Sequence, residues 1–198
     1  MASASIIKNI VRVSVGAFLA IGLLFASTTP GAAVTPDEQG GTSSSVSFLR
    51  DINNARQHPE LYPPHGNTTG AIMTACPAKL QYSSALYQTA AAHNDYLASR
   101  PISWVSTYPN MHRDPNGKLV WESGEPMDRA GYHSYRGEIV AWGFPTSEAA
   151  LRAWMQDDAG SSWGHRNLIL NCALQDAGPA ILQGGPGNHY HTVDMGSR

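Results

Sequence analysis

Five short segments in the second half of the chain carry side chains that can bind metal ions or move protons. Imidazole and carboxylate groups do both near neutral pH. These side chains are notable in this sequence because only 14% of its residues are Asp, Glu, Lys or Arg. We interpret the segments as the walls of one polar cleft. Its candidate residues are His112, Glu138, Asp157, His165 and His189.

Local patterns place two of these residues. Residues 138–142 alternate as a strand does, so Glu138 shares a face with apolar neighbours and needs a polar partner if that face is covered. Thr146 is a predicted helix N-cap, and the helical interval through Trp154 puts Asp157 on the same apolar side. Both carboxylates are therefore expected to point toward apolar surroundings.

The remaining patterns predict helices and a hairpin. Residues 49–56 and 83–99 carry apolar side chains at intervals of three and four, which indicates two amphipathic helices. His93 lies in the buried stripe of the second helix, either as a core histidine or as a neighbour of the cleft. Two apolar runs, 180–183 and 189–195, flank a glycine-rich loop and predict a hairpin. These elements indicate an α+β fold.

The N-terminal segment predicts export. Basic residues precede an apolar stretch that ends in small residues, the order of a secretory signal peptide, and the stretch is shorter than the roughly 20 residues that span a bilayer. We predict a signal peptide at 1–33, a flexible lead at 34–46 and one domain at 47–198. The mature protein is expected to be secreted and extracellular, without a membrane span. An uncleaved membrane anchor is the alternative.

Charge and cysteine content narrow the function further. A formal net charge of −2 without a basic patch argues against a nucleic-acid partner. Cys76 and Cys172 are expected to pair in an oxidising compartment, which would exclude them as metal ligands. The alternative is two unpaired buried thiols.

The order of the motifs resembles that of the CAP superfamily, also called SCP-like. This family includes cysteine-rich secretory proteins, allergen 5 and pathogenesis-related 1 proteins, and the chain looks most like its secreted microbial branch. The resemblance runs from about Ser47 to the C-terminus. Its motifs are Asn53–Arg56, the helix with His93, His112, Gly137-Glu138, Trp154-Met155, Gly164–Asn167 and the final hairpin.

This resemblance implies an α-β-α sandwich, with a small antiparallel sheet flanked by helices, and a cleft that can hold zinc. Carried over residue by residue, the metal ligands are His112, Glu138, Asp157 and His189. His165 is a candidate replacement ligand, and His93 is a second near-site candidate. The family usually has Asn where Ile139 stands and Glu where Asp157 stands.

The resemblance implies extracellular binding, of a lipid, a sterol or a partner, as the main function. The alternative is a metal-dependent hydrolase that acts on an extracellular or cell-wall substrate, with His112, Glu138 and His189 around an activated water. A third interpretation is a scaffold whose polar cluster only organises the core.

Two other enzyme interpretations follow from short motifs. Residues 160–164 match the Gly-x-Ser-x-Gly elbow of serine hydrolases, with Asp176 and His189 following in the right chain order, but the elbow requires a strand before it and a helix is expected there. Glu138 and Asp157 would act as acid and base on a glycosidic bond if they flanked a groove at a suitable separation.

Overall fold

The computed structural model describes residues 43–198. The predicted signal peptide and residues 34–42 of the predicted lead lie outside the described residues. The first helix begins at Ser43, so the end of the predicted lead is helical. Within residues 43–198, no helix combines the length and the apolar character needed to cross a membrane.

The chain alternates helices with four strands. In order, the elements are α1 (Ser43–Gln57), η1 (Pro59–Leu61), β1 (Gln81–Tyr82), α2 (Ser84–Ala98), α3 (Ile102–Val105), η2 (Asn110–His112), α4 (Pro126–Arg129), β2 (Arg136–Trp142), α5 (Ser147–Gln156), η3 (Asp158–Ser161), α6 (Gly164–Ile169), β3 (Asp176–Gln183) and β4 (His189–Gly196).

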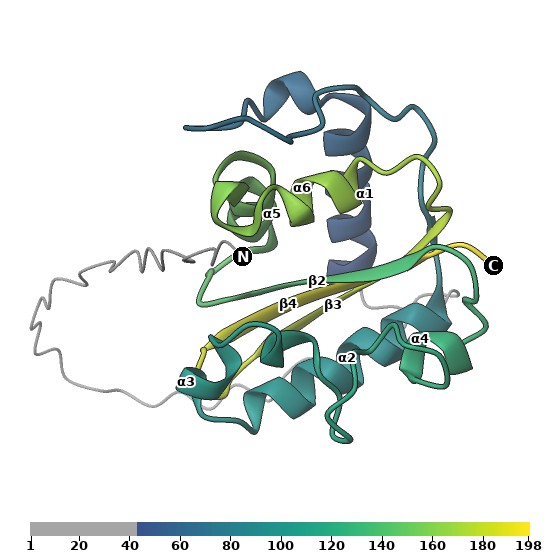
Figure 1. The fold of residues 1–198 in the computed structure, drawn as a ribbon, viewed down its shortest axis with the longest axis vertical. Coiled ribbons are helices and arrows are strands. Elements are labelled where there is room, and N and C mark those ends of the chain that lie inside the picture. The colour runs from purple at the N-terminus through teal and green to yellow at the C-terminus, as the bar shows by residue number, and fades with distance from the viewer. Residues whose placement is uncertain (1–42) are drawn as a thin grey trace, which may run out of the picture. The chain divides into compact units, whose positions relative to one another are not determined.

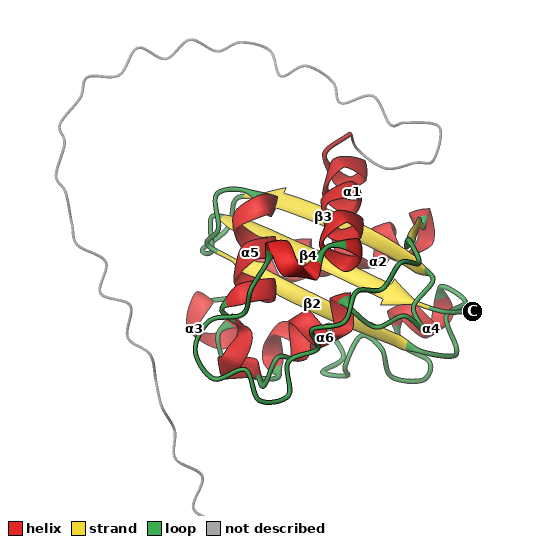
Figure 2. Cartoon of the chain, turned by 90° about the horizontal axis from the view of Figure 1, so that it is seen from above, coloured by secondary structure: helices red, strands yellow, loops and turns green. Residues whose placement is uncertain are grey.

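The sheet lies between two helical layers, as Figure 1 shows. α1, α5 and α6 cover one face, and α2, α3 and α4 cover the other. The strand order is β1-β3-β4-β2, and Figure 2 shows the three long strands side by side with β4 in the middle. The predicted α-β-α sandwich is confirmed. The sheet is mixed rather than purely antiparallel, because the two-residue β1 pairs in parallel with β3.

The predicted helices and hairpin are present because their signals are local. Ser83 caps α2 by accepting a hydrogen bond from Leu86 N (3.2 Å), and Thr146 caps α5 in the same way through Ala149 N (3.1 Å). β3 starts earlier than predicted and contains Pro179. Since β1 ends before this position, the missing N–H of Pro179 removes no ladder bond.

The face of the sheet under α2 is packed tightly. A Cβ atom placed on Gly178 of β3 would lie 2.0 Å from the backbone nitrogen of Tyr87. A side chain at this position would therefore push α2 away from the sheet. The glycine sets the depth at which α2, and with it His93, sits on the strands.

Two buried arginines and a disulfide hold the long loop between α1 and β1. Arg166 donates to the carbonyl oxygens of Tyr62 (2.8 Å), Met155 (2.5 Å) and Ile72 (2.7 Å). Arg56 donates to the carbonyl of Ala78 (3.3 Å). The Cys76–Cys172 disulfide is present, with a Cα–Cα distance of 5.5 Å.

β2 is an edge strand of the sheet. All of its 7 residues pair with β4, and its other edge has no strand partner within residues 43–198. Side chains alternate as predicted: Val140 packs in the cluster with α2 residues, while Ile139 and Ala141 pack in the cluster that includes α1 and α5. Glu138 therefore lies on the α2 face.

Candidate functional site

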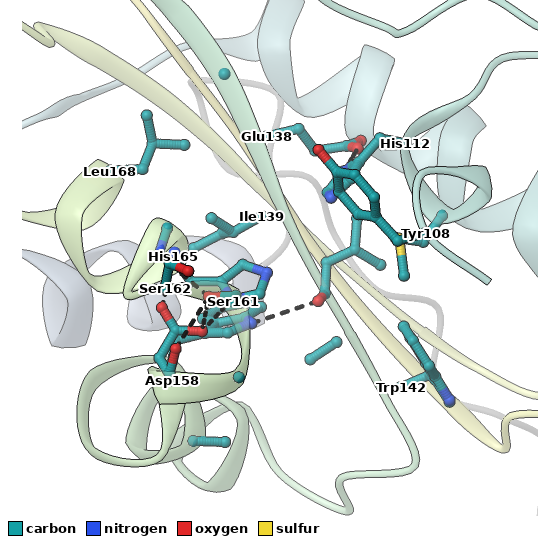
Figure 3. A pocket seen from close by; sticks show the side chains of 18 of the residues that line it. Tyr108, His112, Glu138, Ile139, Trp142, Asp158, Ser161, Ser162, His165 and Leu168 are labelled. Carbon is teal, nitrogen blue, oxygen red and sulfur yellow. Dashed lines mark hydrogen bonds and ion pairs between the residues drawn. The ribbon is translucent and has the colours of Figure 1, made fainter. Parts of the chain in front are cut away.

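A cleft of about 980 Å³ runs along the free edge of β2, and we call it the edge cleft. Every residue of β2 contributes to it. Figure 3 shows its two sides, with His112 and Glu138 on one side of β2 and His165 and Asp158 on the other. The side under the α2 layer has Tyr108, Met111, His112 and Trp121, and the opposite side has Phe144 and residues between Ala153 and Leu168.

Glu138 binds two imidazoles, and we call these three residues the Glu138 triad. His93 Nδ1 donates to Glu138 Oε2 (2.5 Å), and His112 Nδ1 donates to Glu138 Oε1 (2.8 Å). The side chain of Glu138 is 0% exposed, and those of His93 and His112 are 4% and 8% exposed. The buried carboxylate therefore has the polar partners that its position in the strand requires.

Charge within the triad follows from its hydrogen bonds. His93 Nε2 donates to the carbonyl of Arg113 (3.1 Å), so both ring nitrogens face acceptors and the ring is held as an imidazolium. Burial alone lowers the pKa of His93, but the charge of Glu138 and the two hydrogen bonds outweigh it and raise the pKa. Burial alone raises the pKa of Glu138, but His93 and His112 outweigh it and lower the pKa.

Asp194 is a second buried carboxyl group beside the triad. It lies opposite Glu138 in the register of β2 and β4 and accepts a hydrogen bond from Thr89 Oγ1. Burial and the neighbouring charge of Glu138 raise the pKa of Asp194 well above its ordinary value. Asp194 is not among the residues predicted from the sequence, because its proximity to Glu138 depends on the strand register.

Asp158 and His165 form a pair on the other side of the cleft, which we call the Asp158 pair. His165 Nδ1 donates to Asp158 Oδ1 (2.6 Å), and Asp158 Oδ2 accepts from the backbone nitrogens of His165 (2.8 Å) and Arg166 (3.1 Å). Asp158 thus binds the first turn of α6 and fixes the ring beside it. This imidazole is 25% exposed.

The structure brings only some of the predicted site residues together. His112 and Glu138 are in contact, and His93 completes their group. Asp157 lies at the edge cleft but has a 63% exposed side chain that accepts from His65 Nδ1 (2.9 Å). His189 is not among the residues that line the cleft.

Local geometry explains both differences. α5 ends at Gln156, and Asp157 is its C-cap with φ −116° and ψ 26°, so the predicted helical interval does not extend to Asp157. In β4, Glu138 faces Asp194 across the ladder, so residues of even number share its face. His189 has odd parity and therefore points to the opposite face of the sheet.

The predicted zinc ligands do not form a ligand set in this arrangement. Both oxygens of Glu138 are engaged by imidazole Nδ1 atoms. Among residues 43–198, no group of three or more His, Cys, Asp or Glu is placed to hold a metal ion. Zinc binding therefore stays a prediction from the family resemblance.

The two short-motif enzyme interpretations lack their geometry. Residues 160–164 connect η3 to α6, so no strand precedes Ser162 as the hydrolase elbow requires. Asp176, its proposed acid, accepts instead from the hydroxyl of Tyr132 (2.8 Å). Glu138, the proposed glycosidase acid, has both oxygens bound to histidines and a fully buried side chain.

Comparisons with known proteins agree with the architecture. The family described as CAP, the cysteine-rich secretory protein family, matches residues 49–195. No curated protein matches the chain. Among solved structures, the CAP domain of Enterococcal PrgA is similar with a TM-score of 0.50 and 13% identity, covering 82% of this chain and 63% of that chain. At this identity the likeness concerns the fold.

Two further structures are similar at lower TM-scores. An outer surface protein from Borrelia burgdorferi has a TM-score of 0.49 and 18% identity, over 77% of this chain and 91% of that chain. An extracellular protein containing a SCP domain from Bacillus anthracis has a TM-score of 0.45 and 16% identity, over 84% of this chain and 45% of that chain. The chain thus spans less than half of the Bacillus protein.

Proposed function

Since the chain belongs to the CAP family, the cysteine-rich secretory proteins, we propose that it is secreted and acts by binding an extracellular ligand or partner in the edge cleft. The sequence of its N-terminal segment and the Cys76–Cys172 disulfide support an exported protein. The ligand classes that the family resemblance implies are a lipid, a sterol or a protein partner.

The observation that carries this proposal is the composition of the edge cleft. Its volume of about 980 Å³ is typical of sites that enclose a ligand. Aromatic rings from Tyr108, Trp121 and Trp142 line it and offer apolar contact area. His112 and His165 add polar groups on opposite sides, and each ring is oriented by a carboxylate. Apolar walls with a few fixed polar groups favour binding.

Two exposed tyrosines give a matched test. Tyr108 lines the cleft and is 77% exposed, whereas Tyr135 is 63% exposed and does not line it. Neither ring is part of the buried core, so a variant with alanine at either position should fold. A fluorescent sterol and a fluorescent fatty acid would be titrated while energy transfer from tryptophan is followed, because Trp121 and Trp142 line the same cleft.

We expect Tyr108→Ala to weaken binding about fivefold or more and Tyr135→Ala to leave it unchanged, because only Tyr108 contributes ring contact to the ligand. A probe that binds both variants equally well binds elsewhere on the protein. If neither lipid probe binds the wild type, the lipid and sterol classes are excluded and a protein partner remains.

Hydrolysis is the second candidate function, and the two imidazoles that line the edge cleft favour it. His112 and His165 each use Nδ1 to bind a carboxylate. Within residues 43–198, neither Nε2 atom has a hydrogen-bond partner, so each ring presents a nitrogen that can accept a proton from a water molecule in the cleft. A hydrolase would lose turnover in His165→Ala while keeping its fold, and a panel of extracellular ester, peptide and glycan substrates would reveal it.

A further inference from the structure

We propose that the edge cleft binds an extended polypeptide segment, which adds to the sheet as a further strand beside β2. This inference rests on the proposed function, since it assigns a ligand class to the same cleft. It comes from the backbone of β2 rather than from the histidines. Strand addition to a free sheet edge is an established mode of peptide recognition.

The register of β2 and β4 fixes which backbone groups of β2 face the cleft. Gly143 N donates to His189 O (3.0 Å), so residues of odd number point their backbone groups at β4. Glu138, Val140 and Trp142 have the other parity, and their N–H and C=O groups point away from β4. The indole of Trp154 confirms this direction, because it approaches Val140 O at 3.4 Å from outside the sheet.

Almost none of these outward N–H and C=O groups forms a hydrogen bond within the chain. Within the described residues, no backbone group hydrogen-bonds to the N–H or C=O groups of Glu138, Val140 or Trp142 on this edge. Glu138 and Val140 are nevertheless only 5% and 4% exposed. Backbone groups at such depth normally have partners, so this edge is suited to a ligand that supplies them.

The charge pattern of the edge selects the ligand class. N–H groups carry partial positive charge and C=O groups partial negative charge, and they repeat every second residue along β2. The complement is a chain that presents donors and acceptors in the same alternation, which an extended polypeptide backbone does and a lipid tail does not. The floor of the cleft thus favours a peptide, while the aromatic walls suit its side chains.

The two edges of the sheet differ in a way that supports this assignment. At the far edge, β1 covers only Asp176 and Ala177, and the outward edge of β3 beyond it contains Pro179, which has no N–H group to donate to an added strand. β2 has 7 residues, from Arg136 to Trp142, and contains neither proline nor lysine, residues that commonly protect an edge. Its edge is recessed between the walls of the cleft, so a single strand can enter more easily than the edge of a second folded sheet.

Ligand side chains would alternate between the two walls. Those on one side of the added strand would meet Tyr108, His112 and Trp121, and those on the other side would meet Phe144 and Leu168. Arg136 closes one end, since its side chain donates to Trp121 O (2.5 Å). The expected ladder therefore runs from Glu138 to Trp142.

Amide hydrogen exchange tests the ladder directly. Peptides of about seven residues, the length of β2, would be selected from a random-sequence library on the wild-type protein and added to the isotope-labelled protein. We expect the amides of Glu138, Val140 and Trp142 to exchange about tenfold more slowly or less with peptide bound, because each gains a partner. Ile139 and Ala141 already pair with β4 and serve as internal controls.

Backbone methylation of the selected peptide gives the complementary test. N-methylation at alternate positions should weaken binding about tenfold or more on the side that faces β2, and much less on the intervening positions. Failure to select any peptide, protection of other amides, or equal sensitivity at all positions would overturn the inference. Protection that rises with protein concentration alone would identify a second copy as the occupant, which would also overturn it.

The outcome for the peptide is separable from that for the proposed function. If Tyr108→Ala loses a lipid probe while no peptide protects the β2 amides, cleft binding stands and strand addition fails. If neither the lipid probes nor any peptide engages the edge cleft, strand addition and the lipid and sterol classes fail together, and a folded protein partner remains for the cleft.

Discussion

Replacing the carboxylate of Glu138 with an amide tests whether charge holds the Glu138 triad together. Glu138→Gln keeps the length of the side chain and two hydrogen-bonding positions but removes the negative charge. His93 would then lose the carboxylate that it binds, and with it the largest of the interactions that outweigh burial and stabilise its imidazolium form. We expect a folded but less stable protein.

The size of the loss follows from the two hydrogen bonds at 2.5 and 2.8 Å. Each is charge-assisted, and a bond of this kind contributes about 1.5 to 3 kcal/mol, against about 0.5 to 1.5 kcal/mol for a neutral one. If His93 releases its proton, its Nδ1 atom can accept from the amide nitrogen of the new Gln while His112 still donates to the amide oxygen. Both charge-assisted bonds then become neutral ones, which costs about 2 to 3 kcal/mol. Because the triad is buried, solvent screening does not reduce this value much.

The pH dependence of the difference has a defined sign. The pKa of Glu138 is lowered on folding, so its contribution is present above the ordinary value of 4.5 and is lost as the pH falls through the folded pKa. The pKa of His93 is raised, so its contribution is present below the ordinary value of 6.5 and is lost as the pH rises through the folded pKa. Wild type and variant should differ most between these two values.

Urea unfolding at several pH values measures this directly. Asp157→Asn is the matched control, because Asp157 was predicted to share the site but is 63% exposed and pairs with an equally exposed histidine. It should change the free energy of unfolding by no more than about 0.5 kcal/mol. A loss below about 1 kcal/mol in Glu138→Gln, or a loss that does not vary with pH, would refute the charged triad.

Three further predictions concern the charge and packing around the triad. The pKa of Asp194 is raised well above 3.8, so its stabilising contribution is lost as the pH rises through the folded pKa. Asp194→Asn should therefore be more stable than wild type under alkaline conditions, because wild type then buries an ionised carboxylate beside Glu138. Asp114→Asn should instead be less stable than wild type at neutral pH. Burial alone would raise the pKa of Asp114, but its hydrogen bonds outweigh burial and lower the pKa. Urea unfolding of both variants would show the contrast. Gly178→Ala should lose about 3 kcal/mol or more, because its Cβ would meet the α2 backbone, whereas Gly160→Ala has nothing within 4 Å and should unfold thermally within about 2 °C of wild type.

The elements that the sequence predicted correctly are those determined by neighbouring residues. The apolar stripe of α2 is set within a few turns of one helix. Thr146 caps α5 for the same reason, and the loop at 184–188 joins two strands that pair with each other. Local propensity and apolar periodicity contain enough information for such features.

The sequence predicted that Glu138 needs a polar partner, but it did not indicate which residue that partner is. His93 meets Glu138 because α2 lies across the sheet at the depth that Gly178 permits. Asp194 meets it because of the strand register. Both relationships join segments far apart in the chain, and no local pattern encodes them.

Asp157 and His189 were both predicted to lie in the site, but in each case the next residue along the chain has the predicted orientation. The reason is the same for both. Asp157 follows the last residue of α5 and turns outward, whereas its neighbour Asp158 is buried and binds His165. His189 precedes Tyr190, which is buried on the face of β4 that Glu138 shares. In helices and strands a shift of one position changes the face, so residue type alone cannot locate a site.

The edge position of β2 accounts for the separation of the two histidine groups. The Glu138 triad lies on the α2 face of the strand, and the Asp158 pair lies beyond its opposite face, so a single ion would have to bridge the strand to bind both. A ligand that lies along the edge meets both groups at once, because the edge cleft includes His112, His165 and all of β2. The same alternation that sends the side chain of Glu138 to His93 turns its backbone N–H toward the cleft. An added strand would therefore bind the backbone of Glu138, whose carboxylate organises the triad. It would also contact the imidazoles of His112 and His165 without any metal between them.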